Sequence, residues 1–380
     1  MSLAPSHFVT VDNLPHIAAA YSEGLAGRVL NAVWERFEES LGAEGWVCAL
    51  GTWGLELIPS SPDLPCGRFD LEAALHAAAS RPIVSGSCHV LPSLVCSRSR
   101  PAGSPVLGYP HFDVAQYRLD MSAAVHAFMA LEQGDLKFAE QPVVAANGEN
   151  KVLYHECLAR LCDGNIGVIL PGAYMPSLER LGLCRVFDRN VVRSITQQLR
   201  ERPDATLGCN ISGQSVVRDF WWATILADLE ANPEIARRLV VEITETALPE
   251  STIGAVNFVQ ALRRTGCRVA IDDFGAGFSS ISFAREAKAD IIKIDGSYVR
   301  RRGVVPGADG LLAHLVALAK DLSSSVVIEG IENEDDLRAA AEAGGDWLQG
   351  YFFRISTAQP VSVPPVLSLG RAYEGRSVLQ

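Results

Sequence analysis

The chain has 380 residues, of which 48% are hydrophobic and 20% charged, a composition typical of a soluble globular protein with more than one domain. Its formal net charge of −11 argues against broad binding to DNA or to anionic membranes, but it leaves room for a local pocket that takes a phosphate ester. No stretch reaches 18 apolar residues, and residues 1–13 have neither a basic nor a long apolar region. We therefore expect a cytoplasmic protein with no membrane insertion.

Nine cysteines occur without regular CxxC pairs. Several of them, including Cys184, Cys209 and Cys267, lie in apolar segments. This pattern indicates free buried thiols in a reducing compartment rather than a disulfide framework.

The first part of the chain, residues 1–110, is predicted to be a small α/β domain. Expected in order are a strand at 8–11, a helical pattern over 18–37, a hairpin over 46–58, a helix at 70–79 and two further strands ending at 96. Residues 97–110 contain Pro, Gly, Ser and Arg without periodicity, which favours a domain boundary there, followed by a linker at 111–120.

In the second part, residues 121–365, strands alternate with helices. The expected strands are 138–144, 152–161, 167–169, 205–211, 238–243, 268–272, 291–294, 325–328 and 347–349, and the expected helices are 121–134, 176–182, 185–200, 218–231, 254–266, 280–287, 310–322 and 334–344. This alternation predicts parallel βαβ units, and about 240 residues of them suit a TIM-type (β/α)8 barrel. A doubly wound open sheet is the alternative, but no Gly-x-Gly-x-x-Gly fingerprint supports it. We expect residues 366–380 to form a C-terminal tail.

The barrel region contains a buried strand that ends in two adjacent carboxylates, Asp272 and Asp273, followed by the Gly-rich segment 275–280. Taken alone, Asp-Asp before Gly is more often a turn than a metal site. However, side-chain alternation relaxes at a strand end, so both carboxylates could converge on one divalent cation.

Polar residues also follow the other apolar strands. At the strand ends lie Glu156, Asn210, Glu242, Asp272, Asp273, Lys293, Glu329 and Gln349. Each has an ordinary interpretation: Asn210 could cap a helix, Glu242 and Glu245 could be a solvated pair, and Lys293 could form a rim salt bridge. Together they favour a site for Mg²⁺ or Mn²⁺, because carboxylate and amide oxygens without His or Cys suit hard cations.

Several segments in this region are similar to the EAL domain of cyclic-di-GMP phosphodiesterases. They are Glu156-Cys157-Leu158-Ala159-Arg160, Glu242-Ile243-Thr244-Glu245, the segment from Asp272 to Ser280, Lys293-Ile294-Asp295, Glu329-Gly330-Ile331-Glu332 and Gln349-Gly350-Tyr351. The resemblance runs from about residue 121 to 355. It departs from the family pattern at Cys157, where the signature has Ala, and in Phe353-Arg354-Ile355-Ser356, which lacks the usual Pro.

The resemblance implies a role for each matching residue. A first metal would be held by Glu156, Asn210, Glu242 and Asp272, while Asp272 would bridge to a second metal near Asp273. Lys293 and Glu329 would hold and deprotonate the attacking water, and Glu245 would brace the 275–280 loop. Gln141, Arg160 and Gln349 would contact the substrate, Arg160 through a phosphate.

The implied function is metal-dependent hydrolysis of cyclic di-GMP to linear pGpG by a homodimer that pairs through barrel helices. The alternative is a non-catalytic cyclic-di-GMP receptor or a protein-interaction scaffold. Receptors of this family tend to have lost some of the metal and base residues, and this sequence retains them.

Residues 8–100 resemble a degenerate GGDEF (diguanylate cyclase) domain. Thr10 stands where the family has its first Asp, Ala18-Ala19 replaces an Asn-Asp pair, and Gly51-Thr52-Trp53-Gly54-Leu55 lacks both acidic residues of the signature. The resemblance therefore implies no cyclase activity. This domain is either a packing scaffold or a module for a protein partner. Trp53 at the hairpin tip could anchor such a partner or fill the core.

Overall fold

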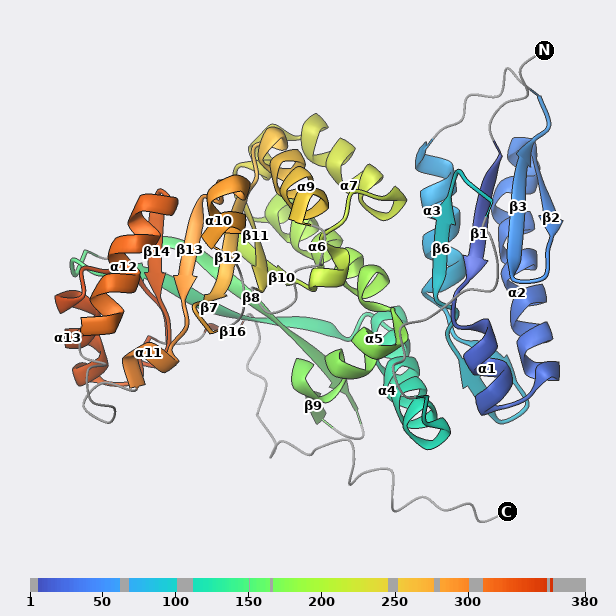
Figure 1. Cartoon of the computed structure of the whole chain (residues 1–380), viewed down its shortest axis with the longest axis horizontal. Helices are drawn as coiled ribbons and strands as arrows, with labels where there is room; N and C mark the ends of the chain where they lie inside the picture. Colours follow the sequence, from blue (N-terminus) through green and yellow to red (C-terminus); the bar gives the residue numbers. More distant parts are fainter. Residues whose placement is uncertain are drawn as a thin grey trace.

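The structure is a computed structural model that describes residues 6–61, 68–100, 112–149, 151–164, 167–244, 252–276, 281–300, 310–353 and 356–357 (Figure 1). Within these ranges no helix is both long and apolar enough to cross a membrane. The eight cysteines described are all free, as expected, and Cys184, Cys209 and Cys267 are buried.

The N-terminal unit is built on an antiparallel sheet with strand order β2-β3-β1-β6. Its strands are β1 (His7–Val11), β2 (Trp46–Leu50), β3 (Gly54–Pro59) and β6 (Leu94–Ser97), and its remaining elements are α1 (Leu14–Ala20), α2 (Glu23–Leu41), a 3-10 turn (Gly42–Glu44), α3 (Arg68–Ala79) and the hairpin β4 (Ile83–Ser85) and β5 (Cys88–Val90). The expected hairpin over 46–58 is confirmed as β2–β3. The single helical pattern predicted over 18–37 is split between two helices, α1 and α2. The break occurs at Ser22, which caps α2 by accepting a hydrogen bond from Leu25 N at 3.1 Å.

The second unit is a closed ring of eight strands, which confirms the predicted barrel. In ring order the strands are β7 (Leu136–Ala145), β8 (Val152–Asp163), β10 (Leu207–Ile211), β11 (Leu239–Thr244), β12 (Arg268–Phe274), β13 (Ile291–Ile294), β14 (Ser325–Ile328) and β15 (Trp347–Leu348), and β15 pairs again with β7. Two short strands, β9 (Gly167–Ile169) and β16 (Ser356–Thr357), pair outside the ring.

One strand of the ring differs from the prediction of uniformly parallel units. β7 runs antiparallel to both of its neighbours, β8 and β15, while the other pairs are parallel. The cause is the connection between β7 and β8, residues 146–151, which is too short for a crossover helix and therefore joins the two strands as a hairpin.

The helices that follow the strands pack on the outside of the ring (Figure 1). They are α5 (Met175–Leu181), α6 (Cys184–Glu201), α7 (Phe220–Ala231), α8 (Pro233–Ala236), α9 (Thr252–Thr265), α10 (Ile281–Ala287), α11 (Ser297–Arg300), α12 (Leu311–Leu322) and α13 (Glu334–Glu342), with 3-10 turns at Pro171–Ala173 and Gly213–Ser215. Before the barrel, α4 (Val114–Glu132) begins seven residues earlier than the helix predicted from Met121. Asp113 caps it through Ala115 N, so residues 114–120 of the predicted linker are helical.

A buried ion pair joins the N-terminal unit to the barrel. Arg189 of α6 contacts Glu72 of α3 at 3.2 Å, and the side chains are 4% and 0% exposed. Glu72 also accepts a hydrogen bond from Thr224 N of α7 at 2.6 Å. Because a buried charge is costly without a partner, this three-way contact holds the two units in a defined arrangement.

Asp188, which precedes Arg189 on α6, supports the segment that follows β10. Its buried carboxylate accepts hydrogen bonds from Ser212 N at 2.8 Å and Ser215 Oγ at 2.6 Å. No cation faces it among the described residues, and burial, reinforced by Glu179, raises the pKa of Asp188 to about 7 despite those two hydrogen bonds.

We expect this carboxyl group to make stability depend on pH. Its pKa in the folded state lies above its ordinary value near 4, so the folded state loses stability relative to the unfolded state as pH rises from about 4 to 7. Asp188→Asn keeps an acceptor oxygen but cannot ionise. The variant should therefore gain stability relative to the parent between pH 5 and pH 8, up to on the order of 3 kcal/mol. Urea unfolding at the two pH values measures this difference, and an equal difference at both would contradict the prediction.

Candidate functional site

The buried ammonium of Lys293 lies at the centre of the carboxyl ends of the barrel strands. Its Nζ is 2.6 Å from Glu242, 2.8 Å from Glu329, 3.1 Å from Asp272 and 3.2 Å from Glu156. These residues come from β8, β11, β12, β13 and the end of β14, which are far apart in the sequence. The acidic residues predicted at separate strand ends are thus brought together around one cation.

Strand alternation explains why these residues share one chamber. A layer of interior apolar residues, among them Tyr154, Val240, Ala270, Ile291 and Val327, forms its own buried cluster in the barrel. Residues two positions apart on a strand point to the same side. Each of these apolar residues is followed two positions later by a site residue, respectively Glu156, Glu242, Asp272, Lys293 and Glu329. The apolar layer is therefore the floor of the polar site.

Three amide side chains complete the ring of polar groups. Asn210 Nδ2 donates to Glu156 Oε1 at 2.5 Å, and Gln349 Nε2 donates to Glu156 Oε2 at 2.5 Å and to Gln141 Oε1 at 3.1 Å. Gln141 lies opposite Glu156 in the register of β7 and β8. Of the predicted substrate residues, Gln349 therefore contacts the same carboxylate as Lys293, and Gln141 contacts Gln349.

A bulge brings Asp273 to the same mouth as Asp272. The register between β12 and β13 shifts between Ile271 and Phe274, and Asp273 has a φ of 56°. A positive φ breaks the alternation of a strand, and Asp tolerates it better than most residues. As a result Asp272, Asp273 and Glu329 each offer an oxygen within 4.8 Å of the others, even though Asp272 and Asp273 are adjacent in the chain.

The electrostatics of the site reflect an excess of negative charge. Burial raises the pKa of Glu329 to about 8 and that of Asp273 to about 6, and in both cases repulsion from Asp272 adds to the effect. Burial and neighbouring carboxylates also raise the pKa of Glu242. At Glu156 burial is outweighed by Lys293 and by the hydrogen bonds from Gln349 and Asn210, so its pKa is lowered. One ammonium does not neutralise this set of carboxylates.

The arrangement fits divalent cations. Two groups of carboxylates, Glu156–Glu242–Asp272 and Asp272–Asp273–Glu329, have ligand atoms within 4.8 Å of one another, and Asp272 belongs to both. Among the described residues, the buried Oδ1 of Asn210 and Oε1 of Glu242 accept no hydrogen bond. Buried oxygens without partners are costly, and an oxygen-only ligand set suits Mg²⁺ or Mn²⁺.

Two predicted residues are not placed in this cluster. Arg160 lies four residues beyond Glu156 on β8, and among the described residues its guanidinium donates only to its neighbour Ala159 O, at 2.8 Å. Glu245 lies outside the described residues, as do residues 277–280 of the Gly-rich segment.

Sequence reasoning missed two residues that shape the site, Tyr298 and Gly208. Tyr298 Oη donates to Gly275 O and so holds the backbone just after the two aspartates. Gly275 has a φ of 93°, and a Cβ there would meet the Tyr298 ring at 3.0 Å. Gly208, two positions before Asn210, leaves room for Glu242 and Tyr154, since a Cβ there would lie 2.5 Å from Glu242 Oε1. Gly208 could have been found from the sequence, because it lies two positions before Asn210 on β10 and so faces the same side. Nothing in the sequence indicated the role of Tyr298.

The N-terminal unit offers no comparable cluster: both groups of potential metal-binding carboxylates found in the described ranges lie in the barrel. Thr10, at the expected position of the first acidic residue, donates to Asp12 Oδ1 at 2.6 Å. Trp53 is half-buried and packs against the hydrophobic core, which favours its interpretation as a core aromatic.

Comparisons with known proteins agree with this geometry. The EAL domain family model matches residues 125–356. The cyclic di-GMP phosphodiesterase PdeF of Escherichia coli K12 is 30% identical over 236 residues, which make up 61% of this chain but only 31% of PdeF. The structure of PaMucR phosphodiesterase in complex with c-di-GMP is 25% identical with a TM-score of 0.57, covering 62% of this chain and 98% of that one.

A further solved structure has the same fold over most of the chain. The S helix-GGDEF-EAL portion of Vibrio cholerae LapD has a TM-score of 0.57 and covers 92% of this chain and 89% of that one, at 14% identity. This similarity concerns the fold alone, and it includes the N-terminal unit. The family match covers well over half of the sequence and includes the strands that carry the carboxylates around Lys293. The chain therefore belongs to the EAL domain family.

Proposed function

We propose that this protein hydrolyses cyclic di-GMP to linear pGpG with the help of two Mg²⁺ or Mn²⁺ ions. The observation that carries the proposal is the pair of carboxylate groups that share Asp272 beside Lys293, together with the partnerless oxygens of Asn210 and Glu242. The names of the family relatives PdeF and PaMucR supply the reaction and the ligand.

The residues divide between cation binding and substrate binding. Glu156, Asn210, Glu242 and Asp272 would hold the first ion, and Asp272 and Asp273 the second. The side chains of Gln141 and Gln349 meet beside Glu156 and would turn toward polar groups of the substrate. Arg160 would clamp a phosphate through its guanidinium fork.

The reaction would be an in-line attack of water on a phosphodiester. Bound divalent cations would lower the pKa of the attacking water and neutralise charge on the attacking and leaving oxygens. Glu329 lies at the rim of the cluster, with its side chain 18% exposed, and would accept the proton of the attacking water. Lys293 would orient this water and restrain Glu329, to which it is paired at 2.8 Å. Glu245 would brace the loop beside Asp273.

The proposal is tested by incubating the full chain with cyclic di-GMP and Mg²⁺ or Mn²⁺ and separating the products. We expect linear pGpG from the parent protein and a loss of about 10³-fold or more in Glu156→Ala, because this carboxylate lies within reach of the ion site, Lys293 and Gln349. The exposed Glu201 supplies the matched control: Glu201→Ala should retain the parent rate.

The same experiment decides between an enzyme and a receptor. A parent protein that binds cyclic di-GMP in calorimetry but leaves it intact with both metals would contradict hydrolysis and favour the receptor function. A cytoplasmic location, pairing of barrel helices in a homodimer, and a protein partner for the N-terminal unit remain proposals.

A further inference from the structure

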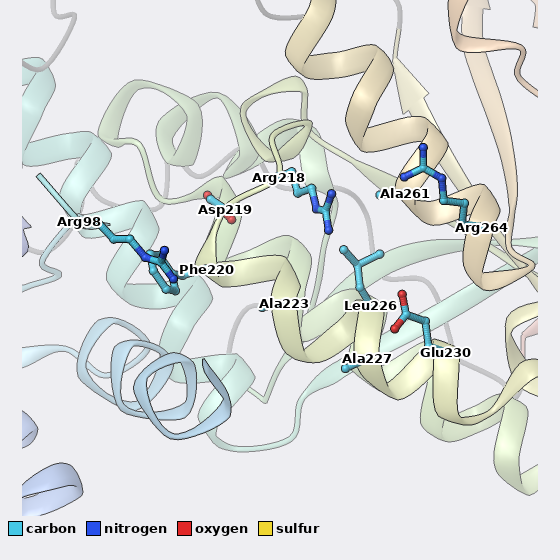
Figure 2. A pocket seen from close by; sticks show the side chains of 10 residues that line it. All are labelled: Arg98, Arg218, Asp219, Phe220, Ala223, Leu226, Ala227, Glu230, Ala261 and Arg264. Carbon is cyan, nitrogen blue, oxygen red and sulfur yellow. The ribbon is translucent and has the colours of Figure 1, made fainter. Parts of the chain in front are cut away.

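A cavity lies at the seam between the N-terminal unit and the barrel, away from the carboxylate cluster (Figure 2). It has a volume of about 550 Å³ and is lined by residues from the end of β6, from α7 and from α9. None of the residues that surround Lys293 lines it. Its volume is within the range of pockets that bind small molecules.

Three arginines from separate segments line this cavity. Arg98 follows β6 of the N-terminal unit, Arg218 precedes α7, and Arg264 lies in the last turn of α9. All three are exposed, and none forms an ion pair or hydrogen bond within the part of the chain that the structure describes. Such a concentration of positive charge is notable in a chain with a net charge of −11.

The acidic residues that line the cavity do not cancel this charge. Asp219 is paired with Arg185 at 3.0 Å and also caps α7 by accepting from Trp221 N. Glu230, one α-helical turn beyond Leu226, is not paired with any arginine among the described residues. With Asp219 neutralised by Arg185, the three arginines leave the cavity with a positive balance, which favours an anionic ligand.

The rest of the lining is apolar. Ala223, Leu226 and Ala227 of α7 and Ala261 of α9 line it beside the ring of Phe220. Phe220 also packs edge to face on His7 of β1, with ring centroids 5.4 Å apart, so its position depends on both units. A flat apolar group suits such a surface, and guanidinium groups suit phosphate oxygens.

We propose that this seam cavity binds a nucleoside phosphate, with the phosphate on the arginines and the base against Phe220 and the alanines. The cavity is several times larger than an inorganic phosphate. A phosphate alone would leave the apolar lining uncovered, so a larger ligand with an apolar part fits it better. Both walls are already positioned, because α7 is tied to the N-terminal unit by the Glu72–Thr224 hydrogen bond. The ligand would contact both units and strengthen their docking. This site is independent of the proposed hydrolysis.

Calorimetric titration of the full chain in EDTA tests the proposal with three probes: GMP, guanosine and inorganic pyrophosphate. GMP is expected to bind one site per chain, with guanosine and pyrophosphate each at least about 10-fold weaker. The double variant Arg218→Glu/Arg264→Glu should weaken GMP binding by at least about 10-fold, because it reverses two charges. Arg28→Glu, on an exposed part of α2, changes charge outside the cavity and should leave binding unchanged.

Further variants keep the outcome interpretable. Arg218→Gln/Arg264→Gln removes the charges without reversing them, and circular dichroism checks that each variant is folded. Glu156→Ala should bind GMP like the parent. Unchanged GMP affinity in both arginine variants, or loss of binding in Glu156→Ala, would overturn the seam site. Pyrophosphate binding as tightly as GMP would overturn the recognition of a nucleoside.

Discussion

Lys293→Met is expected to lower the rate of cyclic di-GMP hydrolysis by about 10³-fold and to make the protein's stability depend strongly on added divalent cation. Lys293 contacts Glu156, Glu242, Asp272 and Glu329, all within 3.2 Å. Without its ammonium these carboxylates repel one another in a buried site, so the metal-free variant should unfold at lower temperature than the parent. A bound cation offsets this repulsion and stabilises the folded state by mass action.

Thermal unfolding in EDTA and in Mg²⁺, combined with the hydrolysis assay, measures both effects. The rise in melting temperature caused by Mg²⁺ should be larger for Lys293→Met than for the parent. Lys320→Met removes an exposed lysine that pairs with Asp346 and should change neither quantity. If Lys293→Met is as stable as the parent in EDTA, the ammonium does not balance the carboxylates as described.

Glu72→Gln is expected to destabilise the protein by about 3–5 kcal/mol, the range measured for a buried ion pair that loses one partner. Arg189 would remain 4% exposed with no carboxylate beside it, and Thr224 N would lose a charged acceptor. Because Glu72 belongs to the N-terminal unit and Arg189 and Thr224 to the barrel, the loss is expected at the seam between them. Urea unfolding monitored by tryptophan fluorescence gives the free energy.

An exposed ion pair between α6 and α7 provides the control. Arg200 of α6 pairs with Asp228 of α7, but these side chains are 35% and 42% exposed. Arg200→Met should therefore cost no more than about 1 kcal/mol. The double variant Glu72→Leu/Arg189→Met removes both buried charges and should recover part of the loss. A cost for Glu72→Gln as small as that for Arg200→Met would show that the seam is not held by this pair.

Much of the site could be predicted because the relevant information is local. Five strands carry a residue of the buried apolar layer and, two positions later, a polar site residue, as in Val240 and Glu242 or Ile291 and Lys293. The predicted bounds of β13 and β14 match the observed strands. Parallel strands around a ring must then present these polar residues at one end. The convergence of the carboxylates follows from alternation together with the barrel.

The remaining features depend on contacts between distant segments. The reversal of β7 places Gln141 opposite Glu156, yet its strand pattern looks like the others. The positive φ of Asp273 comes from a register shift against β13, which the residues 272–274 do not indicate alone. Arg189, the partner of Glu72, lies 117 residues away in the chain. The sequence alone does not distinguish a buried Glu from an exposed one.

The apolar layer beneath the carboxylates has a consequence for the order of events. The buried cluster of Val143, Tyr154, Val240, Ala270, Ile291 and Val327 fills the barrel interior below Lys293, so the site is closed on that side by packed side chains. In the proposed hydrolysis, substrate, water and cations would therefore arrive from the carboxyl ends of the strands, and the product would leave on the same side. Release of the product would then precede binding of the next substrate molecule at the same carboxylates, so it would be a step of each proposed reaction cycle.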